Sequence, residues 1–168
     1  MTGPVHVIVW GGGRTLAPRA VLVHGTMTGG YGRARLRRAA AAGRDGRALV
    51  VDRRGFGASP DVDRSDYELD AVDIAGLMEG GAHLVGHSYG GVVAMLAAAL
   101  ARMRAAIAEA PAARSHAARL RAAATAMRGR PCWEADVLRV EGASHWPHAE
   151  RPGVVNSALR RLWRRVAG

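Results

Sequence analysis

Three short apolar runs constrain the fold of this 168-residue chain more than any other feature of the sequence. They span residues 20–24, 48–52 and 82–86, and each stops at glycine or polar residues. Runs of this length without polar alternation are typical of parallel strands that are buried on both faces. We therefore predict that each run is a strand inside a sheet.

Sequences with helical character separate and follow these runs. Five such stretches occupy residues 32–42, 66–79, 89–102, 116–127 and 154–166. Further strands are expected at residues 5–10, 105–108 and 136–140. This alternation predicts a single α/β domain over residues 1–168, in which helices cover both faces of a mostly parallel sheet.

The sequence Gly86-His87-Ser88-Tyr89-Gly90 lies where the third run meets an expected helix. A sharp turn between a strand and a helix lifts a serine hydroxyl out of the sheet, and flanking glycines let the chain pass closely. The helix N-terminus adds backbone N–H groups beneath the serine oxygen. We therefore predict that Ser88 is a nucleophile. A chance match is the alternative, because the chain contains 22 glycines.

Four stretches, in chain order, resemble the α/β-hydrolase superfamily. They are a strand with a His-Gly turn at residues 21–26, a D-x-R-G-x-G-x-S loop within 50–59, G-x-S-x-G within 86–91, and a histidine loop at 142–152. The resemblance implies a shortened α/β-hydrolase fold without the usual cap domain. It also implies a serine hydrolase that cleaves an ester, thioester or amide through an acyl-serine. An ester is favoured because its alkoxide leaves more easily than an amine.

The resemblance assigns the catalytic base to His145, which directly follows the Gly-Ala-Ser turn of the histidine loop. Neutral imidazole can take the proton of Ser88 and return it to the leaving group. His148 follows closely and is the alternative base. His24 and His87 occupy motif positions at strand ends that shape the site.

The resemblance also places the oxyanion hole and the pocket. The backbone N–H groups of Tyr89 and Thr26 are expected to bind the oxyanion, with Met27 replacing Thr26 if the loop is shifted. Met27, Tyr31 and Trp146 are the expected pocket walls. Without a cap, the site should lie open at the carboxyl ends of the strands, unless a second chain covers it in a homodimer.

The triad acid is the member that the sequence does not determine. Glu109 is the first choice, because it follows the expected strand at residues 105–108 beside the elbow strand. Glu134 and Asp136 are alternatives, since they precede the last expected strand. A lost acid would weaken the base. It would favour a second interpretation, a hydrolase-like protein without turnover that binds a ligand or serves as a structural subunit.

The resemblance implies a small-molecule ester as the partner, and the composition adds no further class of partner. The single cysteine, Cys132, excludes an intrachain disulfide and suits a reducing compartment. No signal peptide or membrane-length apolar run is visible, so we expect a cytoplasmic protein without membrane contact. The net charge of +10 is spread over arginines along the chain, so no nucleic-acid partner is expected. No residue cluster has metal-ligand spacing, and we expect neither metal nor cofactor.

Overall fold

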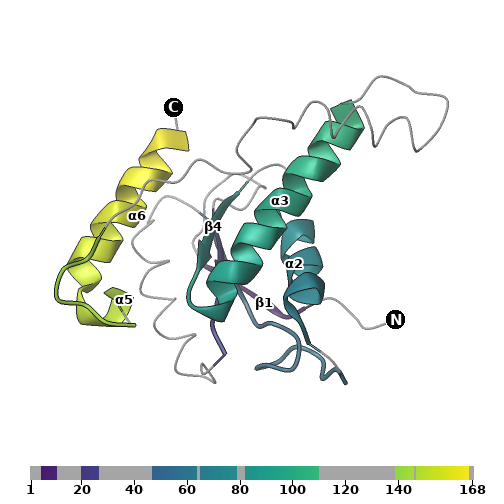
Figure 1. The fold of residues 1–168 in the computed structure, drawn as a ribbon, viewed down its shortest axis with the longest axis horizontal. Helices are drawn as coiled ribbons and strands as arrows, with labels where there is room; N and C mark the ends of the chain where they lie inside the picture. Colours follow the sequence, from purple (N-terminus) through teal and green to yellow (C-terminus); the bar gives the residue numbers. More distant parts are fainter. Residues whose placement is uncertain are drawn as a thin grey trace.

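The computed structural model describes residues 5–10, 20–26, 47–63, 65–78, 82–109, 139–145 and 147–166, except for the side chains of residues 105–109 and 162–166. Its strands form one sheet in the order β1-β3-β2-β4 (Figure 1). The strands are β1 at Val7–Trp10, β2 at Ala20–Val23, β3 at Ala48–Val51 and β4 at His83–Gly86. β2 is parallel to both β3 and β4, whereas β1 is antiparallel to β3. The three apolar runs are therefore adjacent parallel strands, as predicted.

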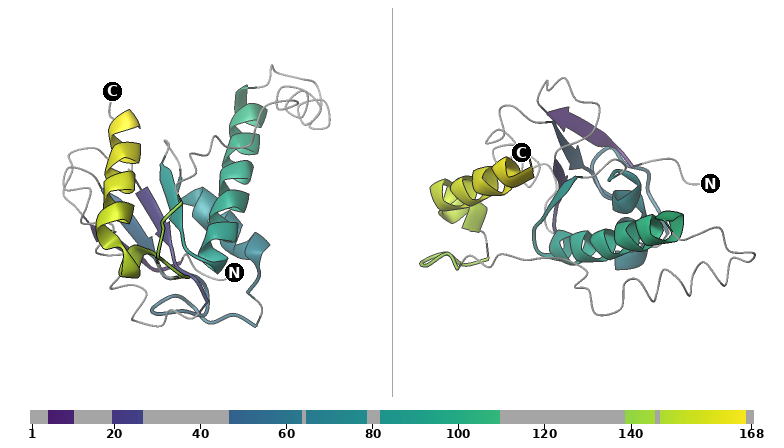
Figure 2. Two further views of the ribbon diagram at one scale, coloured as in Figure 1. Left: turned by 60° about the vertical axis from the view of Figure 1, so that its left-hand side comes forward. Right: turned by 90° about the horizontal axis from the view of Figure 1, so that it is seen from above.

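Helices lie on both sides of this sheet. They are α2 at Tyr67–Gly76, α3 at Tyr89–Glu109, α5 at Pro147–Glu150 and α6 at Pro152–Val166. Figure 2 shows α2 and α3 together on one side of the strands and α6 on the other. The predicted α/β architecture, a mostly parallel sheet with helices on both faces, is thus confirmed.

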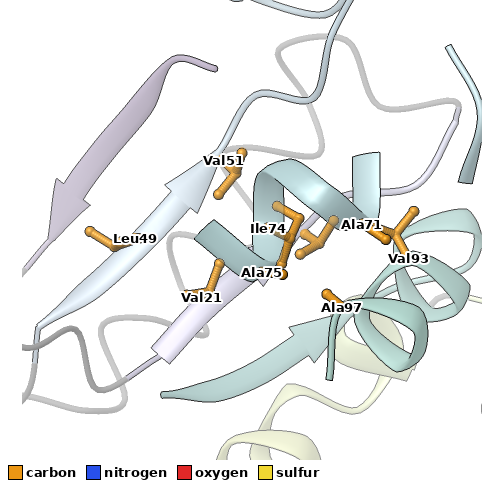
Figure 3. Close-up of a cluster of buried hydrophobic side chains, with 9 residues drawn as sticks. Val21, Leu49, Val51, Ala71, Ile74, Ala75, Val93 and Ala97 are labelled. Atoms are coloured by element: carbon orange, nitrogen blue, oxygen red, sulfur yellow. The ribbon is translucent and has the colours of Figure 1, made fainter. Parts of the chain in front are cut away.

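The larger hydrophobic cluster lies between the sheet and the pair α2 and α3 (Figure 3). Ile74 of α2 and Val93 of α3 are almost completely buried against alternate residues of β2 and β3. Its members are Val21, Val23, Leu49, Val51, Ala71, Ile74, Ala75, Val93 and Ala97. Small alanine side chains on both helices lie in this cluster, and α2 and α3 pack closely against each other there.

A second cluster covers the opposite face of the same two strands. It consists of Ala20, Leu22, Ala48 and Val50, and Leu159 of α6 packs against it. Successive strand residues point to opposite faces of a sheet. Because both faces of β2 and β3 are covered, every residue of these strands is buried. This explains why their sequences are apolar without alternation.

Helix α3 extends beyond its predicted end, and the strand expected at residues 105–108 is wrong. These residues form the last part of the helix that begins at Tyr89 and ends at Glu109. The segment is rich in alanine, leucine, methionine and arginine, which are strong helix formers, and the next proline is Pro111. Local helix propensity therefore outweighs the short apolar pattern that suggested a strand.

Several predicted elements fall outside the described residues. These are the helices at residues 32–42 and 116–127 and residues 136–138 of the last predicted strand. Residues 139–140, the end of that strand, are not in a strand. No helix in the described ranges combines the length and apolar character needed to cross a membrane.

Candidate active site

Ser88 lies at the sharp turn between β4 and α3, as its motif predicts. Its φ is +55°, and within the described ranges it is the one residue other than glycine with a positive φ. Residues with a side chain rarely adopt this left-handed conformation, and it is typical of strained functional turns. The side chain is exposed. The structure therefore presents the Ser88 hydroxyl on a strained turn at the N-terminus of a long helix.

The glycines of the motif are required by close backbone contacts. A Cβ on Gly86 would overlap the carbonyl group of Gly90. A Cβ on Gly90 would overlap the carbonyl oxygens of Val23 and His24. The elbow therefore packs directly against the end of β2, and the N–H group of His87 donates to the carbonyl of Val23 at 3.1 Å.

The His-Gly turn after β2 lies beside the nucleophile. A Cβ built on Gly25 would stand 3.1 Å from the Cβ of Ser88. Thr26 follows Gly25 and is exposed, and Tyr89 follows Ser88 as the first residue of α3. The structure thus brings the two predicted oxyanion segments together. The roles of the Thr26 and Tyr89 N–H groups stay predictions.

His145 reaches the elbow through His87, the residue before Ser88. The Nε2 atom of His87 lies 2.8 Å from the carbonyl oxygen of His145, and the two ring centroids are 4.9 Å apart. His148 of α5 also lies against His87, with a centroid separation of 4.8 Å. Both candidate bases are therefore next to the nucleophile turn, and the assignment to His145 stays a prediction.

Glu150 organises the loop that carries His145. Its two carboxylate oxygens accept hydrogen bonds from the backbone N–H of Ser144 at 2.6 Å and from its hydroxyl at 2.7 Å. Gly142 begins the turn with φ +66°. Neither this contact nor the short helix α5 is predictable from the sequence, because a carboxylate six residues after a serine matches no common capping pattern.

The loop after β3 is fixed by Asp52. Its Oδ2 accepts a hydrogen bond from the N–H of Ala58 at 3.1 Å, and its backbone carbonyl accepts one from the Ser59 hydroxyl. Gly57 has φ +60°, and a Cβ there would overlap the Asp52 carboxylate. Asp52 therefore holds its own loop in place.

A buried polar network lies beneath the His-Gly turn. The Nε2 atom of His24 accepts from the N–H of Arg53 at 3.1 Å, so its Nδ1 carries the proton and donates to the carbonyl of Gly25 at 2.7 Å. Arg53 pairs with Asp70 of α2, with Nη1 2.6 Å from Oδ2. Arg53 thus joins the loop after β3 to α2, and a charged residue at a strand end does not reveal these partners in the sequence.

Burial lowers the pKa of His24 below its ordinary value of 6.5, although the hydrogen bond to Gly25 opposes this effect. The unfolded chain therefore takes up a proton at a higher pH than the folded chain. The contribution of His24 to stability is complete above pH 6.5 and is lost as the pH falls through the lowered folded pKa. We expect the free energy of unfolding to decrease on acidification for this reason.

Urea denaturation at several pH values from about 7.5 to about 5 tests the His24 expectation. The variant His24→Gln cannot take up this proton, so its stability should fall less steeply over the same range. Every other ionisable side chain is the same in both proteins, so the comparison isolates the effect of His24. Identical pH dependence of the two proteins would contradict the expectation.

The structure contradicts the reason for choosing Glu109 as the triad acid. It does not follow a strand beside the elbow but ends α3. With a rise of about 1.5 Å per residue, the backbone of Glu109 lies about 30 Å along the helix from Tyr89. Because His145 lies beside the elbow at the other end of α3, this separation is too large for a triad contact, and the choice of Glu109 is corrected. The alternatives Glu134 and Asp136 lie outside the described residues.

Three further predicted residues, the pocket walls Met27, Tyr31 and Trp146, also lie outside the described residues. Among the residues that are described, no group of three His, Cys, Asp or Glu side chains is arranged to hold a metal ion. The described part of the site therefore consists of the exposed Ser88 on its strained turn, His145 and His148 next to that turn, and the neighbouring His-Gly turn after β2.

Comparison with known proteins points to one family. The model of the Alpha/beta hydrolase family matches residues 20–131, which is more than half of the chain. A search of curated proteins finds no match. A marine microorganism esterase is similar over 58% of this chain and 37% of its own, with 24% identity and a TM-score of 0.48. A lipase-esterase related protein from Clostridium acetobutylicum ATCC 824 is similar over 58% and 42%, with 19% identity and a TM-score of 0.48. The chain therefore spans less than half the length of either structure.

Proposed function

Because the chain belongs to the alpha/beta hydrolase family, we propose that it is a serine hydrolase that cleaves a carboxylic ester of a small molecule. One observation carries this proposal: the exposed Ser88 adopts φ +55° at a strand-to-helix turn, beside the backbone of Gly25. This is the geometry that a nucleophilic serine needs, because the hydroxyl stands clear of the sheet at the N-terminus of a helix, next to the positive end of the helix dipole.

The proposed reaction has two steps that share one proton carrier. The Ser88 hydroxyl attacks the ester carbonyl while His145 accepts its proton, and the resulting oxyanion collapses to release the alcohol, which receives that proton. Water then attacks the acyl-serine, gives a proton to His145, and releases the carboxylic acid as Ser88 regains its proton. The N–H groups of Thr26 and Tyr89 stabilise both oxyanions.

The acid that orients the base is proposed to come from Glu134 or Asp136, since Glu109 is too far away. A hydrolase-like protein without turnover is the competing candidate, because no carboxylate among the described residues is identified as the triad acid. Activity distinguishes the two candidates directly. A catalyst hydrolyses an activated ester through one serine, whereas a binding protein folds without turnover.

Paired histidine variants test the proposed function. His145→Ala and His148→Ala remove neighbouring rings that both lie against His87. We expect His145→Ala to lower kcat for p-nitrophenyl butyrate by roughly 10²- to 10⁴-fold, which is the usual contribution of general base catalysis. The matched variant His148→Ala should stay within a few-fold of the wild type. The reverse result would make His148 the base, and an inactive, folded wild-type protein would contradict the function.

A further inference from the structure

Arg53 contacts one of the two backbone segments that form the proposed oxyanion hole. Its side chain is only 2% exposed. The Nε atom donates to the carbonyl of His24 at 3.2 Å, and Nη2 donates to the carbonyl of Gly25 at 3.4 Å. The next residue is Thr26, whose N–H group is the first proposed oxyanion donor. The guanidinium of Arg53 therefore holds the turn that carries this donor.

The same guanidinium contacts the elbow. Its Cζ lies 4.2 Å from the centroid of the Tyr89 ring, within the range of a cation–π interaction. Tyr89 directly follows Ser88 and supplies the second proposed oxyanion donor. Tyr67 of α2 stacks on the Tyr89 ring with centroids 4.2 Å apart, which further restricts that residue. The buried Arg53 side chain thus contacts both backbone segments that carry the proposed oxyanion donors.

Asp70 and Phe56 hold the guanidinium in place. Nη1 of Arg53 donates to Oδ2 of Asp70 at 2.6 Å, and both side chains are nearly inaccessible to solvent. The Phe56 ring lies 4.6 Å from Cζ. Arg53 therefore cannot move without breaking a buried ion pair. Oδ1 of Asp70 has no hydrogen-bond partner in the described part of the chain.

We propose that Arg53 is a positioning residue for the oxyanion hole: it fixes the separation between the N–H groups of Thr26 and Tyr89. This inference rests on the proposed function. Oxyanion donors act only when they lie about 2.7–3.1 Å from the developing charge. Arg53 is buried and acts through the backbone of Gly25 and the ring of Tyr89. A displaced donor weakens binding of the transition state more than binding of the substrate, so kcat should fall while KM holds.

Arg54 provides a matched control beside Arg53. It pairs with Asp73, also on α2, through Nε at 2.6 Å and Nη2 at 2.8 Å. Both ion pairs therefore join the loop after β3 to the same helix. Within the described part of the chain, the hydrogen bonds of the Arg54 guanidinium go to Asp73 and not to the His-Gly turn. Loss of the Arg54 pair should affect stability without changing the spacing of the oxyanion donors.

Two variants alter Arg53 without leaving an unpaired buried charge. Arg53→Lys keeps a cation facing Asp70 but lacks the fork that reaches two carbonyl groups. The double variant Arg53→Met/Asp70→Leu replaces the ion pair with apolar side chains of similar size, which folded proteins often tolerate. Arg54→Lys and Arg54→Met/Asp73→Leu are the corresponding controls. Circular dichroism verifies that each protein is folded.

The readouts are kcat and KM for p-nitrophenyl butyrate, the inhibition constant of an alkyl trifluoromethyl ketone, and the pH profile of kcat/KM. The ketone adds to a serine to give a bound oxyanion, so its affinity reports the hole directly. We expect both Arg53 variants to lower kcat about 10-fold or more, with the ketone affinity falling by a similar factor. KM and the midpoint of the pH profile should be unchanged, because the base is untouched.

The outcomes separate this inference from the proposed function. A folded Arg53→Lys or double variant with wild-type kcat and ketone affinity would overturn the positioning role. Equal losses in the Arg54 controls would also overturn it, because the effect would then come from the attachment to α2. A folded wild-type protein that neither hydrolyses the ester nor binds the ketone would refute the proposed function itself, and the inference with it.

Discussion

Replacing Ser88 with alanine is expected to reduce the hydrolysis of p-nitrophenyl butyrate by a factor on the order of 10³ or more while leaving the fold intact. The hydroxyl oxygen is the atom that bonds to the acyl group, and no neighbouring atom can replace it. The measurement is kcat at saturating ester, with folding checked by circular dichroism. A Ser88→Ala protein that retains the wild-type rate would contradict the assignment of the nucleophile.

Ser88→Gly is the matched control, because glycine adopts a positive φ without strain. It should be as inactive as Ser88→Ala. It should also be more stable than the alanine variant by roughly 1 kcal/mol, since a Cβ in the left-handed conformation costs about that much. Chemical denaturation measures the difference. Equal stabilities would contradict the strained turn indicated by the φ of +55°.

Gly90→Ala is expected to disrupt both the fold and the activity. The new Cβ would overlap the carbonyl oxygens of Val23 and His24, which are backbone atoms and cannot rotate away. The start of α3 must therefore separate from β2, which moves Ser88 and the N–H group of Tyr89. We expect a loss of about 1–3 kcal/mol or more in the free energy of unfolding. Ester hydrolysis should fall by at least about 10²-fold because the reacting groups are displaced.

Gly91→Ala is the control for this steric argument. It is the next residue of the same helix, but its nearest atoms would be an ordinary 3.8 Å from the added Cβ. Alanine is favoured over glycine within a helix by about 0.8–1.0 kcal/mol. Gly91→Ala should therefore be as stable as the wild type or more stable. If both variants resemble the wild type in stability and kcat, the close contact at Gly90 is absent.

The sequence predicts the sheet well because the strands are buried on both faces. An apolar run without alternation, as in β2 and β3, favours a buried parallel strand when helical stretches separate one run from the next. The elbow at Ser88 is predictable for a similar reason, since only glycine fits the contacts at Gly86 and Gly90. In both cases, packing that is required by the fold leaves a local signature in the sequence.

The strand predicted at residues 105–108 failed because four apolar residues fit either a strand or the end of a helix. The choice depends on what precedes them, and α3 simply continues. The assignment of Glu109 was based on that strand and failed with it. The contacts of Arg53 with Gly25 and Tyr89 join residues that are far apart in sequence, so no local pattern reports them.

Labelling with a fluorophosphonate probe tests the central claim most directly. The probe phosphonylates a serine only when its hydroxyl is activated and the oxyanion hole is formed, and peptide mass spectrometry then identifies the modified residue. We predict a single adduct on Ser88 in the folded wild-type protein, with no adduct in Ser88→Ala or after heat denaturation. A folded wild-type protein without an adduct, or with the adduct on another residue, would contradict the account.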